Sequence, residues 1–372
     1  MADRNKLSKS PFRLSSGRSR WIFSLILLIP ALFAGCAKIT GDETPPGAKD
    51  PTVYVSGYYY DGTNDMPCYW KGTTRVDLPI DSALGPLGGK ANAITVSEGT
   101  VYTGGVEQNE VGAFNTACYW KGTTRVDLNG ALHNEGDGDG VTAIRVSDGK
   151  VYSGLTGYWN SIGTWGGAYF VDTALTIAPH LPSGTSSGVI GLDVSGGKVH
   201  LGGSDFVSGT QYGVVWIDGV ATQMDTVRSQ VYGIKVSDGI VYAAGYRFDS
   251  GVGNIVPCYW KGATRVNLPC DVSGDSRAYA IDVADGTAYT AGVYRSAQTN
   301  AYVACYWKGD VRTDLPGDSG HGNGIAVYKG VAYTAGYYQS GYDNVACYWK
   351  GTTRVDLPGL GGCATGIVVV EE

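Results

Sequence analysis

The chain has 372 residues, 57 of them glycine, and a formal net charge of −6 at pH 7. Residues 1–35 hold six Lys or Arg and one Asp, so residues 36–372 alone carry a net charge of −11. Such an acidic surface does not suit nucleic acid or anionic lipid, so we expect no nucleic-acid partner.

The first 35 residues have the chemistry of an export signal. Six basic residues precede an apolar run from Trp21 to Gly35, which is the arrangement of a signal peptide. The run is shorter than the roughly 20 residues that a membrane-spanning helix needs, and Pro30 would interrupt such a helix. We therefore predict a signal peptide over residues 1–35, with a permanent membrane span as the alternative.

The apolar run ends in Leu-Phe-Ala-Gly-Cys at residues 32–36, which resembles the lipobox of bacterial lipoproteins. In that family the cysteine is acylated and becomes the mature N-terminus, so the resemblance implies that Cys36 is lipidated and binds a membrane. Ala37 is not the Asp linked in that family to inner-membrane retention, which implies the outer membrane, at its periplasmic or surface face. The alternative is a cysteine that follows a signal peptide without being acylated. Residues 36–51 are polar and broken by prolines, so we expect a flexible tether of at most about 50 Å.

From Thr52 onward one unit repeats seven times, marked by three separate motifs. The first, Cys-Tyr-Trp-Lys-Gly, has five full copies, and divergent copies at Ala168 and Val214 fill the gap. The second, Ala or Gly followed by Ile or Leu, any residue and Val, occurs in every unit. The third, Val or Ala before an aromatic ring, recurs at intervals of 42–50 residues, with His200 once in place of the ring. That period is typical of β-propeller blades.

Each unit predicts four short strands. The second unit, for example, predicts strand A at Ala93–Val96, strand B at Val101–Gly105, strand C at Cys118–Trp120 and strand D at Arg125–Leu128. Gly-containing hairpin turns join A to B and C to D. Four strands cannot bury both faces of their sheet, whereas seven units arranged radially cover one another. We predict an all-β, seven-bladed β-propeller with four antiparallel strands per blade.

The two ends of the repeat region predict how the ring closes. The region begins with a B strand at Thr52–Gly57 and ends with an A strand at Gly366–Val370. One blade should therefore combine strands from both termini, which pairs edges that would otherwise stay open. The propeller domain is predicted over residues 52–370, and an open linear array is the alternative.

Part of the repeat is similar to kelch and related propeller repeats. Val-Tyr-Thr-Gly-Gly at residues 101–105 resembles the kelch strand that ends in a double glycine. The Cys-Tyr-Trp-Lys-Gly motif stands where kelch repeats have a Tyr-Asp pair. The resemblance implies the fold and no particular partner.

The cysteines and histidines predict neither a disulfide framework nor a metal centre. Five cysteines occupy the same site in different units, where neighbouring blades should hold them too far apart to bridge. A bridge between Cys270 and Cys363 stays open as an alternative. The four histidines lie in different units without ligand spacing. Residues 135–140 have alternating oxygen donors, as in the front of a calcium loop, but Val146 stands where the closing Glu is needed. We expect no metal and no cofactor.

Strand D carries Arg and Asp at alternate positions, as at Arg75 and Asp77. A repeated carboxylate site is conceivable, but charge on an outermost strand also prevents edge-to-edge pairing, and we favour that interpretation. No phosphate loop or zincin helix is present in the sequence.

Function is predicted from the two ends of the ring. In an antiparallel meander the tight A–B and C–D turns share one face, and the longer B–C and D–A connections share the other. Aromatic residues among Gly, Ser and Asn in the B–C connections are typical of recognition surfaces, although such rings also pack on the blades beneath them. The candidate ligand-binding residues are Tyr58, Tyr59, Tyr60, Tyr158, Trp159, Trp165, Tyr246, Tyr337, Tyr338 and Tyr342.

These observations leave three classes of function open. The favoured one is a monomeric, non-enzymatic cell-envelope lipoprotein that binds a protein or glycan through this face. The second is a propeller enzyme, a glycan hydrolase or lyase, and paired carboxylates in a cleft of the same face would favour it. The third is a scaffold in envelope assembly, which resembles the role of some propeller lipoproteins.

Overall fold

The computed structural model describes residues 50–81, 86–109, 115–128, 138–271 and 275–372, all within one compact unit, Lys49–Glu372. The predicted signal peptide, Cys36 and the tether up to residue 49 lie outside the described residues, so they stay predictions. Residues 135–137 of the acidic segment considered for calcium also lie outside them.

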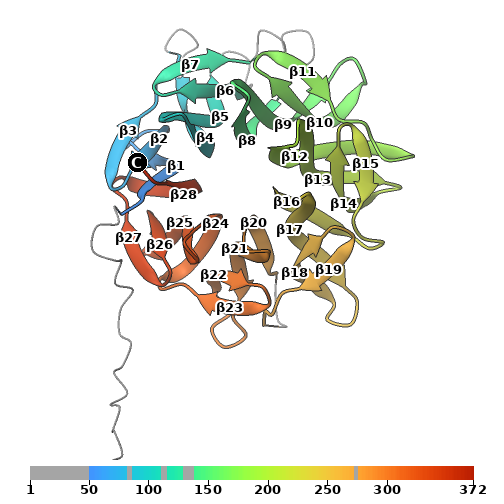
Figure 1. Cartoon of the computed structure of the whole chain (residues 1–372). Coiled ribbons are helices and arrows are strands. Elements are labelled where there is room, and N and C mark those ends of the chain that lie inside the picture. Colours follow the sequence, from blue (N-terminus) through green and yellow to red (C-terminus); the bar gives the residue numbers. More distant parts are fainter. Residues whose placement is uncertain (1–49, 82–85, 110–114, 129–137, 272–274) are drawn as a thin grey trace, which may run out of the picture. The chain divides into compact units, whose positions relative to one another are not determined.

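The described chain forms seven four-stranded antiparallel sheets, arranged as blades around a common centre (Figure 1). The strands of each blade are called A to D from the centre outward. Blade 1 consists of β28 (Leu360–Val370), β1 (Thr52–Tyr60), β2 (Asp65–Lys71) and β3 (Thr74–Asp77). Blade 2 consists of β4 (Pro86–Ser97), β5 (Thr100–Asn109), β6 (Asn115–Lys121) and β7 (Thr124–Asp127). Blade 3 consists of β8 (Gly138–Ser147), β9 (Lys150–Trp159), β10 (Thr164–Val171) and β11 (Ala174–Ile177). Blades 4 and 5 consist of β12 (Gly184–Ser195), β13 (Lys198–Val207), β14 (Thr210–Ile217) and β15 (Val220–Gln223); and β16 (Ser229–Ser237), β17 (Ile240–Asp249), β18 (Asn254–Lys261) and β19 (Thr264–Asn267). Blades 6 and 7 consist of β20 (Arg277–Ala284), β21 (Thr287–Arg295), β22 (Tyr302–Lys308) and β23 (Val311–Asp314); and β24 (Asp318–Tyr328), β25 (Val331–Ser340), β26 (Asp343–Lys350) and β27 (Thr353–Asp356). The predicted fold class is confirmed.

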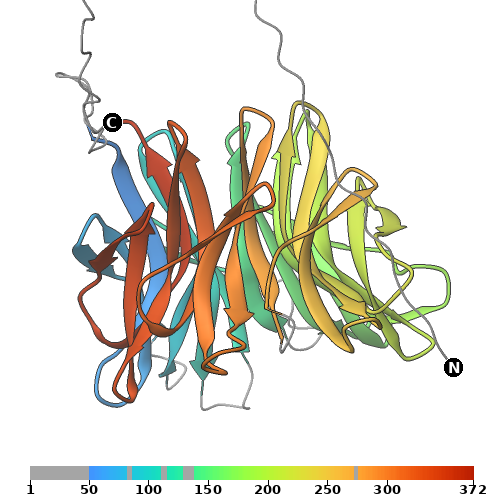
Figure 2. The ribbon, with the colours of Figure 1, turned by 90° about the horizontal axis from the view of Figure 1, so that it is seen from below.

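The connections differ between the two ends of the ring. The A–B and C–D turns are tight, and in blade 2 Glu98 and Gly99 have φ angles of 49° and 72°, as a type I′ hairpin turn requires. The D–A connections and most B–C connections, such as 178–183 and 160–163, are longer, although the B–C turns 208–209 and 341–342 have only two residues each. Because neighbouring strands are antiparallel, the tight turns share one end of the ring, the short-turn face, and the others share the long-loop face. The strands run between these two ends (Figure 2).

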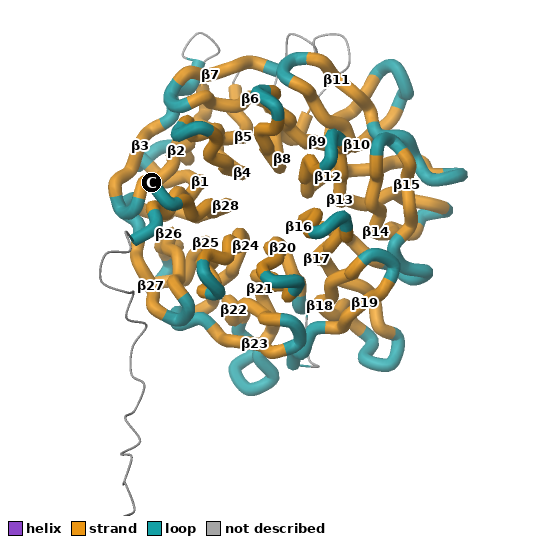
Figure 3. Tube along the Cα trace, viewed as in Figure 1, coloured by secondary structure: helices purple, strands orange, loops and turns teal. Residues whose placement is uncertain are grey.

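Strands, turns and loops make up all of the described residues (Figure 3). None of these residues therefore belongs to a helix long and apolar enough to cross a membrane. This finding concerns only the described part of the chain and does not include the apolar run at 21–35.

Blade 1 joins the two ends of the repeat region. Strand β28 supplies its A strand and pairs with β1 from Thr52↔Val370 to Tyr60↔Leu360. The hydroxyl of Tyr54 donates to the Glu372 carboxylate, and Lys71 forms an ion pair with the same carboxylate at 3.1 Å. The predicted closure is confirmed, and the structure is a ring rather than an open array.

In each blade, a large aromatic ring of strand C packs against the preceding blade. These fully buried rings are Trp70, Trp120, Phe170, Trp216, Trp260, Trp307 and Trp349. In blade 6 the indole Nε1 of Trp307 donates to the carbonyl oxygen of Pro269 in blade 5, at 2.8 Å. Space for the ring comes from a strand B glycine, since a Cβ on Gly105 would lie 2.9 Å from the Trp120 ring and 2.1 Å from the carbonyl oxygen of Lys90.

The strands are longer than predicted. Strand β1 extends to Tyr60 rather than Gly57, and β4 begins at Pro86 rather than Ala93. Nine of the ten aromatic residues assigned to the B–C connections lie within strands as a result, and only Tyr342 lies in a turn. Aromatic residues favour extended strands, so they continue the ladder instead of ending it. The expectation that these rings lie in loops is therefore wrong.

The cysteines of the described chain are all free. The five that share one strand C site are buried, as expected for small apolar residues packed between blades. Cys270 and Cys363 form no bridge either. Cys363 accepts a hydrogen bond from the Asn323 amide at 3.4 Å instead.

Candidate functional site

A repeated irregularity of strand A builds the central channel. In every blade the A–B pairing skips one residue, as at Ala91/Ala93 and Val231/Gly233. A β-bulge re-aims the extra side chain, and here those side chains line a central cavity of about 360 Å³. The skipped residues are Asn92, Thr142, Ile190, Tyr232, Tyr279, Asn323 and Thr365. The second sequence motif begins directly after them.

The small residue that opens this motif has a packing reason. A Cβ on Gly233 would lie 3.0 Å from the Cα of Ala280 in the next blade, and one on Gly324 would lie 3.0 Å from the Cα of Gly366. Neighbouring A strands thus approach too closely for a larger side chain. Ala or Gly at this point holds the blades at a spacing that brings the bulge residues of adjacent blades together.

Four of the rings near the channel pack in a continuous row, which we call the ring stack: Tyr232, Tyr279, His321 and Tyr337. The centroids of Tyr232 and Tyr279 are 5.2 Å apart, and His321 lies 6.1 Å from Tyr279. His321 is nearly parallel to Tyr337, with centroids 5.1 Å apart and an interplanar angle of 12°. The row crosses blades 5, 6 and 7 where their A strands begin, next to the long-loop face.

The electrostatics of the ring stack favour neutral rings. Burial, with a smaller contribution from the Arg277 charge, lowers the pKa of His321 to about 4, so the imidazole is uncharged at neutral pH. Burial raises the pKa of Tyr337 to about 12 and also raises the pKa of Tyr232 and of Tyr279. The three phenols therefore keep their protons and remain hydrogen-bond donors.

One cationic side chain, that of Arg277, lies beside these rings. Arg277 forms an ion pair with Asp275 at 3.1 Å, and its guanidinium lies 5.8 Å from the ring centroid of Tyr246. The Nε of Arg277 is buried and has no hydrogen-bond acceptor. The Arg277 side chain is 29% exposed, so the accessible part of its guanidinium can donate to an oxygen of a bound ligand.

The predicted ligand-binding residues divide according to strand alternation. Tyr58 lies beside Lys90 of the next blade, 4.4 Å from its Nζ to the ring centroid, and Tyr337 belongs to the ring stack. Tyr59 and Tyr338 point to the opposite face of their sheets, where each lies under an arginine of strand D. Those distances are 3.6 Å for Arg75 and 3.7 Å for Arg354, so these two tyrosines pack within blades.

The remaining predicted residues are dispersed. Trp159 is fully buried and donates to the Gly166 carbonyl oxygen at 2.6 Å, so its ring belongs to the core of blade 3. Tyr158 and Trp165 form an exposed edge-to-face pair with centroids 6.2 Å apart. Tyr246 is buried beside Tyr232, with centroids 5.9 Å apart. Among the ten predicted residues, the other two exposed rings are Tyr60 and Tyr342.

Sequence reasoning missed Tyr232, Tyr279, His321 and Arg277. A signal for the first two was present, because the residue before the Ala/Gly-Ile/Leu-x-Val motif varies from unit to unit while the motif does not. A variable position inside a constant repeat indicates a residue that the fold does not require. His321 lies two residues before the matching position of unit 7, and its distance along the chain from Tyr279 hid their contact.

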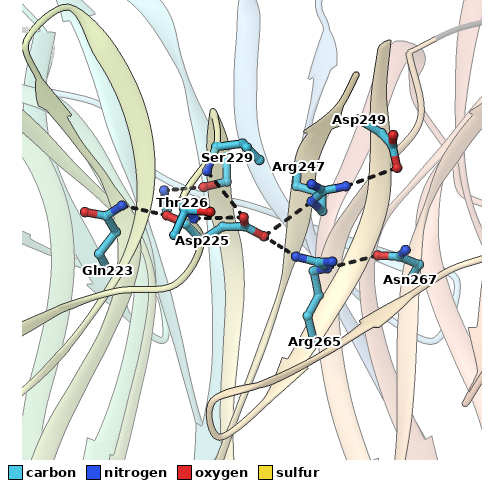
Figure 4. A network of polar contacts seen from close by, with 10 residues as sticks. Gln223, Asp225, Thr226, Ser229, Arg247, Asp249, Arg265 and Asn267 are labelled. Carbon is cyan, nitrogen blue, oxygen red and sulfur yellow. Dashed lines mark hydrogen bonds and ion pairs between the residues drawn. The ribbon is translucent and has the colours of Figure 1, made fainter. Parts of the chain in front are cut away.

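Several buried carboxylates are held by basic side chains. Asp225 accepts from Arg265 at 2.7 Å, lies 3.4 Å from Arg247 and accepts from the backbone N–H of Thr226 at 2.8 Å (Figure 4). Two guanidinium groups thus compensate one buried carboxylate, a structural role consistent with its burial. Glu107 is likewise paired with Arg125, at 2.7 Å.

The comparisons with known proteins add no assignment. No family model matches the chain, and no curated protein matches it. Solved structures similar to it include the computationally designed Ika8 protein, at 15% identity and a TM-score of 0.38, covering 76% of this chain and 93% of that one. A GH43_1 enzyme from Xanthomonas citri has 12% identity, a TM-score of 0.36 and coverages of 78% and 89%. Semaphorin 1b of Drosophila, extracellular domains 1–2, has 9% identity, a TM-score of 0.37 and coverages of 87% and 87%. At these scores the likenesses carry no argument about function.

Proposed function

We propose that this protein is a cell-envelope lipoprotein whose propeller binds a protein segment or a glycan, without catalysis, at the long-loop mouth of its central channel. The observation that carries the proposal is the ring stack, Tyr232, Tyr279, His321 and Tyr337. Aromatic rings on rigid strands give large contact area at little cost in conformational entropy.

The surroundings of the ring stack supply the polar part of such a site. Arg277 supplies a partly exposed guanidinium, and the three stack tyrosines supply protonated phenolic hydroxyls. Binding sites commonly combine apolar and aromatic walls with a few placed polar groups. A ligand with a flat apolar face and a carbonyl, hydroxyl or carboxylate oxygen fits this combination.

The charged groups support binding rather than glycan hydrolysis. Glycosidases use two carboxyl groups about 5 to 10 Å apart. The described residues that line the central cavity include Arg145 and no carboxylate. The buried carboxylates Glu107, Asp193 and Asp225 are each paired with an arginine, and Asp205 lies 3.1 Å from His180.

The entry point of the chain supports the choice of face. Strand β1 begins at Thr52, paired with Val370, and the A–B pairing places this end of β1 at the short-turn face. A tether from Cys36 would therefore join the propeller on the side opposite the ring stack.

The experiment compares three sets of substitutions in the delipidated propeller. A partner is first isolated by pulldown from envelope extract and its affinity measured. Tyr279→Ala and Tyr337→Ala should each weaken binding about 30-fold, equivalent to about 2 kcal/mol. Lys121→Ala and Lys350→Ala at the short-turn face should leave the affinity within about twofold, and each variant must retain a cooperative thermal transition.

A second aromatic set distinguishes the ring stack from the other exposed rings. Tyr158→Ala and Trp165→Ala remove the exposed pair of blade 3 and should leave binding intact. If this pair abolishes binding while the Tyr279 and Tyr337 variants bind normally, the recognition surface lies over blade 3. The ring stack would then be structural, and the proposed site would be wrong.

A further inference from the structure

Strand C also carries a repeated tyrosine, one residue before its Trp or Phe, and the tyrosine ring fills the gap to the next blade. It is present in six of the seven blades, as Tyr69, Tyr119, Tyr169, Tyr259, Tyr306 and Tyr348. Tyr69 packs with Ile94 and Val101 of blade 2, and Tyr119 packs in one cluster with Val151 of blade 3. The ring thus covers the first residues of the next blade's B strand, near its tight turns.

Blade 4 lacks this ring. The matching residue is Val215, which packs with Val241 of blade 5 but is too short to reach as far as a phenol. An apolar pocket of about 450 Å³ opens at the same place. Its walls are strands β14 and β15 of blade 4 and two tight turns of blade 5, including Ile217, Met224, Ile240, Val241 and Gly262.

The rim of this pocket is also less polar than in five of the other six blades. Strand C ends in Lys in five blades, as at Lys71 and Lys121, but in Ile217 in blade 4. Ile240 and Val220 lie beside it with 38% and 66% of their surfaces exposed. Apolar side chains around an apolar pocket are typical of a site that another molecule covers.

We infer that the pocket between blades 4 and 5 receives an aromatic side chain from a partner polypeptide. The other six blades show which group fills this gap, because a tyrosine ring occupies it in each. The protein's own tether cannot supply the ring, since residues 36–51 contain no aromatic residue. The exposed rim favours a polypeptide, because a partner's backbone and neighbouring side chains would cover Ile240 and Val220 while its ring entered the pocket.

The test uses p-cresol, which has the same ring as a tyrosine side chain, and the full propeller. p-Cresol should bind the wild-type protein saturably, with a Kd of about 1 mM, and give NMR contacts to the methyl groups of Val215, Ile240 and Val241. Val215→Tyr supplies the missing ring within the chain. It should abolish these contacts and raise the Tm by about 2 °C.

The matched control is Tyr259→Val, which makes the same change between blades 5 and 6. It should create a second p-cresol site while leaving the first unchanged. Saturable binding with no contact to the three methyl groups, or equal binding by wild type and Val215→Tyr, would overturn the inference. The wild-type NMR contacts decide the matter even if a variant fails to fold.

Capped peptides distinguish a polypeptide partner from a small phenolic ligand. Acetyl-Gly-Tyr-Gly-amide should compete with p-cresol and shift the Ile240 and Val220 methyl signals, whereas acetyl-Gly-Leu-Gly-amide should bind at least tenfold more weakly. If p-cresol binds and the tyrosine peptide is excluded, the pocket accepts only free small rings. That result would refute the polypeptide partner.

Discussion

The indole N–H of strand C shows how single hydrogen bonds tie the blades together. It donates to the carbonyl oxygen of a proline in the preceding blade for five of the six tryptophans: Trp70, Trp120, Trp216, Trp307 and Trp349. Trp260 is the exception, and its Nε1 is buried without an acceptor. Asp225 stands where the proline stands elsewhere, and its carbonyl accepts from Gln223 instead.

This difference predicts unequal effects for the same substitution. Trp307→Phe removes a hydrogen bond and leaves the Pro269 carbonyl unpaired, whereas Trp260→Phe removes a donor that has no partner. Both variants lose the same ring volume. Trp307→Phe should therefore lower the free energy of unfolding by about 1 kcal/mol more than Trp260→Phe does, as measured by urea unfolding. Equal losses would show that the indole bonds add nothing to stability.

The residue scale also shows what the sequence could predict about the site. Side chains alternate along a strand, so Tyr58 and Tyr59 had to face opposite sides once β1 was known to include them. The contact of Tyr279 with His321 could not be predicted in the same way. It depends on the spacing of two A strands in neighbouring blades, which no local pattern determines.

At the scale of elements, strand β28 closes the ring, and we predict that the propeller loses stability when this strand is removed. Its removal would leave the inner edge of β1 unpaired along Thr52–Tyr60 and take Ile367 out of the apolar cluster that buries Val55. Deleting residues 360–372 should therefore abolish the cooperative thermal transition of the whole propeller, followed by circular dichroism.

A shorter deletion is the control for this experiment. Removing only Glu371 and Glu372 eliminates the contacts with Tyr54, Lys71 and Lys329 but keeps the strand ladder. Exposed ion pairs contribute little, so the Tm should fall by no more than a few degrees. A chain without β28 that melts like the intact protein would contradict the role assigned to the clasp.

The elements themselves were predictable in number and order but not in length. Gly at the turns and the Cys-Tyr-Trp-Lys-Gly motif located the hairpins, because these residues are tied to local backbone geometry. At the long-loop face, strand B was predicted to end too early and strand A to begin too late. Residues such as Gly88 and Lys90 pair across to β5 through bulges, and bulged pairing has no simple period in sequence.

At the scale of the whole molecule, the seven-fold period was sufficient for the fold, since each repeat contributes one blade. The sequence also makes a prediction about the envelope that depends on Cys36. Cys36→Ser removes the thiol needed for acylation, so it should abolish labelling by a fatty-acid probe and release the protein from membranes. Labelling that persists in the variant would place the anchor elsewhere.

The clasp also fixes an order of events in time. Strand β1 is the first strand of the ring to be synthesised, and its inner neighbour β28 (Leu360–Val370) is the last. In a polypeptide that is synthesised N-terminus first, blade 1 therefore stays incomplete until β28 has been made. Only then can the ring close. For an exported chain this delay is useful. If the chain is exported as proposed, blade 1 stays open while the chain crosses the membrane, and pairing of β28 with β1 then completes the ring.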